Sequence, residues 1–177
     1  NGLFAGPPHS EYYLMLATNV YDFTSNLPYL VIGTYGTTIN DTRNTIVSLQ
    51  LHEPINGVTS LTNPPTLVSR GAAKIRGSST DGLPKASYAI QFADEFEQDK
   101  NTSLLGLPAD SEWVLYAPNV YDPVLIHNPF IHQLSRNIGQ YSPRTRFVVV
   151  FYNKGGLVLT NQYAGIYVDR KSTRLNS

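Results

Sequence analysis

One stretch of the sequence combines residue types that suit an anion. It reads RGSSTDGLPKASYAIQF, from Arg76 to Phe92, and places a basic residue, a glycine and two hydroxyls before a lysine that starts an alternating segment. A bound phosphate needs backbone N–H groups exposed by a tight turn, and cations to meet its charge. The stretch supplies both and is a candidate phosphate site. Its residues are Arg76, Gly77, Ser78, Ser79 and Lys85.

The same turn also fits a plain β-hairpin. Asp81-Gly82 is a strong turn signal by itself, and a hairpin explains it without any ligand. A hairpin does not require the side chain of Lys85 to point inward. The residues alone leave a phosphate site and a structural turn both open.

Other titratable residues give weaker signals. His127 and His132 are five positions apart and would not share one helix face, so they predict no metal site. The carboxylates of residues 94–99 lie in a polar loop, where nothing apolar would shift their pKa. Cysteine is absent, which excludes disulfides and a cysteine nucleophile. We therefore assign no catalytic residue and no metal ligand.

Composition narrows the class of partner. The 177 residues include 13 basic and 13 acidic side chains, so the formal net charge is zero. A neutral chain has no field-driven attraction to nucleic acid or to an anionic membrane. No apolar run approaches the roughly 20 residues that a membrane helix needs. We expect neither a nucleic-acid partner nor a membrane span.

The elements that must position the candidate site are mostly strands. Alternating or apolar runs followed by turn signals predict them. One helix is predicted between Asp122, which is placed to cap it, and Gly139, which is placed to close it. Pro123 suits its first position, and Pro129 predicts a kink or break. The predicted strands are residues 12–16, 28–34, 46–52, 72–76, 87–92, 113–116, 146–152 and 163–168.

Together these elements predict an α+β fold, in which one principal helix packs on a mainly antiparallel sheet. The apolar helix face comprises Phe130, Leu134 and Ile138. One face of strand 113–116 should pack beneath it, because the helix stripe must be covered. That strand face is either Trp113 with Leu115 or Val114 with Tyr116.

Six blocks of the sequence resemble, in order and spacing, the CotH (spore coat protein H) kinase family. They are RGSST, PKASYAIQF, SLLGLPADSEWVLYAP, YDPVLIHN, YSPRTRFVVVFYN and YAGIYV, within a resemblance that runs from about Ser25 to Val168. The resemblance implies a β-rich atypical kinase-like amino-terminal lobe. It also implies ATP phosphates near the RGSS turn and Lys85, and a divalent metal such as Mg²⁺ in the intact protein. The implied partner is an exported, spore-coat or surface protein that receives phosphate on serine, at a secreted or cell-surface location.

The sequence departs from the family pattern at several positions. Ala86 replaces the second basic residue of the usual PKKSY, and the helix pattern is altered at Pro123, His127 and Pro129. These departures keep open an alternative, a non-catalytic surface adhesion or coat-assembly module of the same family. In the family, the metal-binding and catalytic acids lie after the part of the domain that this sequence covers. This fragment alone is therefore predicted to be inactive.

The resemblance also divides the chain. Residues 1–27 are expected to be an entry strand or a linker, and residues 28–168 a partial CotH kinase-like domain. Residues 169–177, DRKSTRLNS, leave the family pattern and resemble a translated sequencing adaptor. We expect this tail to be non-native, extended and packed on nothing.

Overall fold

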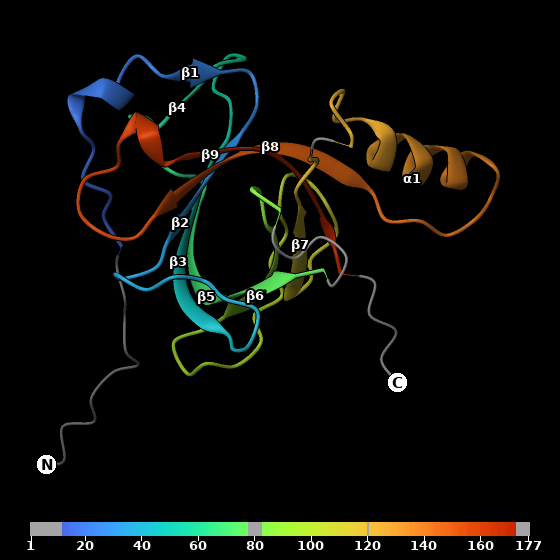
Figure 1. The fold of residues 1–177 in the computed structure, drawn as a ribbon, viewed down its shortest axis with the longest axis horizontal. Helices are drawn as coiled ribbons and strands as arrows, with labels where there is room; N and C mark the ends of the chain where they lie inside the picture. The colour runs from blue at the N-terminus through green and yellow to red at the C-terminus, as the bar shows by residue number, and fades with distance from the viewer. Residues whose placement is uncertain (1–11, 78–82, 120, 173–177) are drawn as a thin grey trace, which may run out of the picture.

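The computed structural model describes residues 12–77, 83–119 and 121–172. Seven of its strands form a closed barrel in the order β2-β3-β5-β6-β7-β9-β8 (Figure 1). Neighbours are antiparallel except β2 and β8, whose parallel pairing closes the barrel. The strands are β2 (Tyr29–Gly33), β3 (Thr45–His52), β5 (Leu67–Arg76), β6 (Ser87–Ala93), β7 (Glu112–Tyr116), β8 (Thr145–Asn153) and β9 (Tyr163–Lys171).

The fold is mainly β, so the predicted α+β class is wrong. Strand accounts for 41% of the described residues and helix for 11%. A sheet that closes on itself buries one face inside the barrel and needs no helix to cover that face. The kinase-like α+β lobe that the resemblance implied is therefore replaced by a closed barrel with one short helix beside it.

The barrel interior follows the period-two alternation of the strands. In β3, Val47, Leu49 and Leu51 belong to the inner core. In β6, Ile90 and Phe92 point the same way into this core, and the strand predicted at residues 87–92 is confirmed. The inner core also contains Leu30, Ile32, Ala73, Trp113, Leu115, Val148, Val150 and Tyr167.

A second apolar cluster covers the outer side of β2 and β8. Tyr29 and Val31 of β2 pack there with Phe151 of β8, so these two strands are buried on both faces. The cluster also contains Val20 of η1 (Thr18–Val20) and Leu61. Leu61 follows β4 (Thr59–Ser60), which pairs with β1 (Thr24–Ser25), and η2 (Thr160–Gln162) precedes β9. The strand predicted at residues 12–16 is wrong, because Leu16 makes only an isolated bridge, to Val158.

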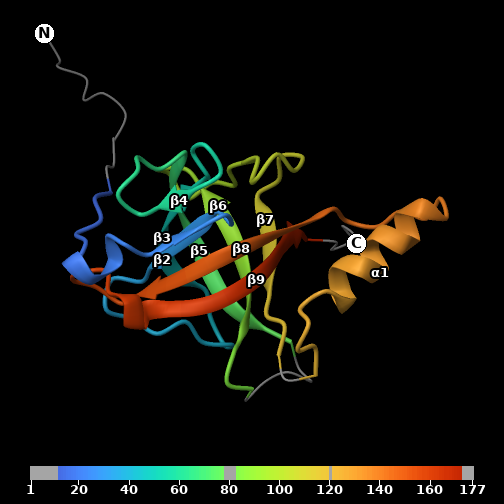
Figure 2. The ribbon, with the colours of Figure 1, turned by 90° about the horizontal axis from the view of Figure 1, so that it is seen from above.

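The helix α1 (His127–Asn137) projects from the side of the barrel in both views (Figures 1 and 2). None of its residues is buried, and Phe130 is 59% exposed. The predicted packing of its apolar face on strand 113–116 is wrong for either strand face, since Leu134 and Ile138 are exposed as well. No helix within the described ranges is long and apolar enough to cross a membrane.

The ends of α1 are partly as predicted. Asp122 lies before the helix and its carboxylate accepts a hydrogen bond from the backbone N–H of His127, 3.2 Å away. Gly139 has a φ of +83° and closes the helix, with its N–H donating to the carbonyl of Arg136. Pro129 falls in the first turn, where its missing N–H costs no helical hydrogen bond. The predicted break near Ile126 is confirmed, because the helix begins only at His127, and the prediction that Pro123 is its first residue is wrong.

The predicted tail boundary at Val168 does not coincide with a structural boundary. Strand β9 continues through Lys171, and Asp169 is only 1% exposed. Lys171 forms an ion pair with Asp110 at 2.6 Å. The expectation that this segment packs on nothing is thus wrong for residues 169–171, and residues 173–177 lie outside the described part of the chain.

Candidate functional site

Lys85 lies at one end of the barrel, just before β6. Its ammonium donates hydrogen bonds to the backbone carbonyls of Ile166 in β9 and Pro118 after β7. The same nitrogen lies 4.5 Å from the ring centroid of Tyr167, a cation–π contact. Strand β9 and the segment after β7 therefore position this one cation.

A glycine in β9 makes room for the lysine. Gly165 has a φ of +111°, next to a register shift between Val150 and Phe151 of β8. A Cβ at Gly165 would lie 3.1 Å from Cε and 3.3 Å from Nζ of Lys85. The position thus requires glycine both for its backbone conformation and for the approach of the side chain.

Three stacked tyrosines line the barrel interior beside Lys85. The ring of Tyr88 lies 6.0 Å from that of Tyr167 and 6.5 Å from that of Tyr152. Burial raises the pKa of Tyr88 and of Tyr167, so both phenols stay neutral at physiological pH. These neutral phenols therefore do not offset the positive charge of Lys85.

The electrostatics of Lys85 are unusual for a surface cation. In the described parts of the chain, no carboxylate forms an ion pair with it. Burial lowers the pKa of its ammonium from 10.5 to about 8. Most of the population is still charged at pH 7, and among the described residues the charge is met by carbonyl dipoles and a ring face. Such a cation is available to an anion.

The main chain around Lys85 is held by side chains that the sequence did not single out. Asn119 donates its amide Nδ2 to the carbonyl of Lys85 at 2.9 Å. Ser87 accepts a hydrogen bond from the backbone N–H of Ala117 at 2.9 Å. Asn119 and Gly165 carried weak signals, a turn asparagine and a glycine within a strand, and both gain meaning only from the fold.

The other predicted phosphate residues are placed only in part. Arg76 ends β5 and pairs with Ser87, so it lies at the same end of the β5–β6 hairpin as Lys85. Its side chain lines the outer side of the wall with Lys74, whereas Lys85 lies over the inward-facing Tyr167. Gly77 has a φ of +103°. The predicted residues Ser78 and Ser79 lie outside the described residues.

A second titratable group lies on the inner face of β9. Both carboxylate oxygens of Asp169 are buried and accept no well-formed hydrogen bond from the described residues. Burial raises the pKa of this carboxyl from 3.8 to about 8. At pH 7 it is mainly neutral, and it gives the ammonium of Lys85 no counter-ion.

The helix histidines have structural partners. His127 Nδ1 lies 2.6 Å from a carboxylate oxygen of Asp122, and His132 Nδ1 lies 2.7 Å from the hydroxyl of Ser142. Among residues 12–77, 83–119 and 121–172, no three His, Asp or Glu side chains gather as a metal site would require. The described residues therefore do not fit a bound Mg²⁺ by themselves.

Comparison with known families gives one match. A family model described as CotH kinase protein matches residues 73–174. No curated protein matches the chain. The matched region contains Arg76 and Lys85 together with strands β6 to β9, and it extends beyond the boundary predicted at Val168.

Proposed function

We propose that this chain, which belongs to the CotH kinase protein family, contributes the phosphate-binding lysine of an ATP-dependent protein kinase. ATP supplies the phosphoryl group when bound, and Lys85 holds its phosphate oxygens. The acceptor we propose is serine on an exported, spore-coat or surface protein, so the protein itself acts outside the cell or at its surface.

One observation supports the proposal above the others. The ammonium of Lys85 is half-buried, held by β9 and the segment after β7, and not paired with a carboxylate in the described residues. An incoming triphosphate offers what this ammonium lacks, which is a full negative charge. A lysine in a purely structural hairpin turn would gain nothing from such burial, because burial disfavours its charged form.

Lys85 would position phosphate in this scheme and would not move a proton. Phosphoryl transfer depends mainly on positioning and on charge stabilisation around the transferred group. A fixed ammonium serves both needs, since its carbonyl partners hold it in place before the substrate arrives. The described residues do not fit Mg²⁺, so we assign no step to a metal.

Calorimetric titration of the chain with ATP tests this function. Lys85→Met keeps the apolar stem and removes the charge, and it should weaken binding by about 1–3 kcal/mol. Lys154→Met is the matched control, since the exposed ammonium of Lys154 lies 6.0 Å from the Tyr152 ring centroid. Equal affinities for all three proteins, or no binding by the unmodified chain, would favour a non-catalytic adhesion or coat-assembly module.

A further inference from the structure

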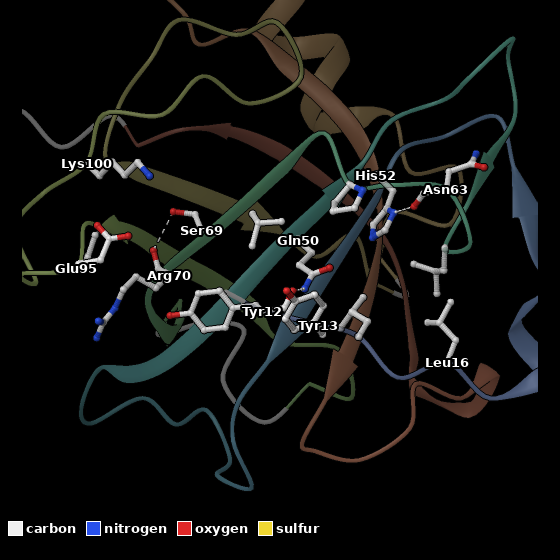
Figure 3. A pocket seen from close by; sticks show the side chains of 15 residues that line it. Tyr12, Tyr13, Leu16, Gln50, His52, Asn63, Ser69, Arg70, Glu95 and Lys100 are labelled. Atoms are coloured by element: carbon white, nitrogen blue, oxygen red, sulfur yellow. Dashed lines mark hydrogen bonds between the residues drawn. The ribbon is translucent and has the colours of Figure 1, made fainter. Parts of the chain in front are cut away.

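A hollow of about 650 Å³ lies on the outer wall of the barrel (Figure 3). Its floor is the outward-facing side of β3 and β5, and the chain segment 12–16 forms one rim. The loop after β4 and the loop after β6 complete it. Its volume falls within the range of pockets that hold small organic ligands. The hollow does not include Lys85 and is independent of the proposed nucleotide contact.

A buried histidine at one end of the hollow has an unused acceptor. His52 is 2% exposed, and its Nδ1 lies 3.0 Å from the carbonyl of Asn63. A carbonyl only accepts, so Nδ1 carries the hydrogen and Nε2 carries a lone pair. That Nε2 is buried and has no hydrogen-bond partner among the described residues. Burial lowers the pKa of the ring, so the lone pair is present at neutral pH.

The rim of the hollow carries two tyrosines. The backbone carbonyl of Tyr12 accepts a hydrogen bond of 2.9 Å from Nε2 of Gln50, which fixes this segment to β3. Gln50 is 4% exposed although it lies on the outer wall. The neighbouring Tyr13 is 82% exposed and presents its ring beside the hollow (Figure 3). An aromatic rim results over a floor in which the polar side chains of Gln50 and His52 lie beside the apolar Leu61 and Val68.

The opposite end carries charges of both signs. Arg70, Glu95 and Lys100 lie there, away from His52 and Asn63 (Figure 3). Arg70 is also paired with Glu97 at 3.5 Å. These charges nearly cancel, so the hollow suits a neutral ligand that both donates and accepts hydrogen bonds along its length.

We propose that this hollow binds a short neutral oligosaccharide. A sugar hydroxyl donates to Nε2 of His52, and further hydroxyls exchange hydrogen bonds with Arg70 and Glu95. The apolar faces of the pyranose rings lie against Tyr13. A purely apolar ligand would leave the His52 acceptor unpaired. It would also bury the other polar side chains of the floor without partners, which costs free energy.

Titration by ligand-observed NMR and calorimetry tests the proposal, with maltotriose, cellotriose and triacetylchitotriose as probes. At least one should bind with a Kd of about 1 mM or tighter. Tyr13→Ala should weaken that binding by about fivefold or more, a loss typical of one aromatic contact. His52→Leu should weaken it by about tenfold, the equivalent of one buried hydrogen bond.

Tyr141→Ala is the matched control, because Tyr141 is 83% exposed and lines a different hollow. It should bind like the unmodified chain. Because His52 is buried, a His52→Leu protein that fails to fold leaves the decision to Tyr13→Ala, whose side chain is at the surface. The proposal is overturned if no probe binds at about 10 mM, or if Tyr13→Ala and Tyr141→Ala bind alike.

Discussion

Lys85 and Asp169 are two titratable groups against the inner wall of the barrel that reach nearly the same pKa from opposite directions. Burial lowers the pKa of Lys85 from 10.5 to about 8 and raises that of Asp169 from 3.8 to about 8. Their surroundings differ. The lysine is half-buried and donates to two carbonyls, whereas the carboxylate is fully buried without a well-formed hydrogen bond.

This comparison distinguishes a titratable group with fixed hydrogen-bond partners from one that is only buried. Desolvation alone shifts both pKa values, so a shifted pKa by itself does not mark a functional site. Lys85 adds fixed partners, a bulge that makes room for it, and access for an anion. Asp169 adds only a cost to the folded state when it ionises.

Asp169→Asn gives the largest expected effect, because the amide cannot ionise. In the unmodified protein the folded pKa lies above the unfolded value, so the folded state holds the proton more tightly. The contribution to stability is complete below about pH 4 and is lost as pH rises through 8. At pH 9 the variant should be more stable by about 1–3 kcal/mol.

Urea unfolding at pH 5 and pH 9 measures this gain, which should shrink at the lower pH. Asp41→Asn is the control, since Asp41 is exposed, and it should change neither value. A protein whose stability does not fall between these pH values would show that Asp169 is not buried as described.

Gly165→Ala tests the room made for Lys85. The left-handed φ of +111° strains any other residue, and the new Cβ meets the lysine stem at 3.1 Å. We expect a loss of about 1–2 kcal/mol in the free energy of unfolding. Gly57→Ala shares a positive φ of +82° but meets nothing within 4 Å, so it reports backbone strain alone. Equal losses would mean that Lys85 does not press on this position.

Lys85→Met has the smallest expected effect on stability, within about 1 kcal/mol at pH 7. The folded pKa of Lys85 lies below its unfolded value, so the unfolded state binds more protons between pH 8 and 10.5. Stability of the unmodified protein should therefore rise over this interval, and the rise should disappear in the variant. A variant that retains the rise would assign it to another group.

Strand positions could be predicted from the sequence because alternation is a local property. The strands predicted at residues 46–52 and 87–92 are examples, since they are β3 and β6 of the structure. Closure of the barrel could not be predicted. It depends on the pairing of Tyr29 with Val149, and nothing in either segment indicates its distant partner. The helix stripe was visible too, but an apolar stripe does not say what covers it.

The candidate site also has one part that could be predicted from the sequence and one part that could not. Lys85 could be predicted as a lysine at the start of a strand, and it lies where such a role requires. Its partners are the backbone carbonyls of Ile166 and Pro118, which carry no residue-type signal. The Ser78 and Ser79 part of the phosphate turn stays a prediction, because those residues lie outside the described part of the chain.

The most direct test is an NMR titration of the Lys85 side chain, assigned by its loss in Lys85→Met. Without nucleotide, its pKa should be about 8. With saturating ATP, the bound phosphate should favour the charged form and raise the pKa toward 10.5 or above. A pKa that saturating ATP leaves unchanged would place the phosphates elsewhere and contradict the proposed role of Lys85.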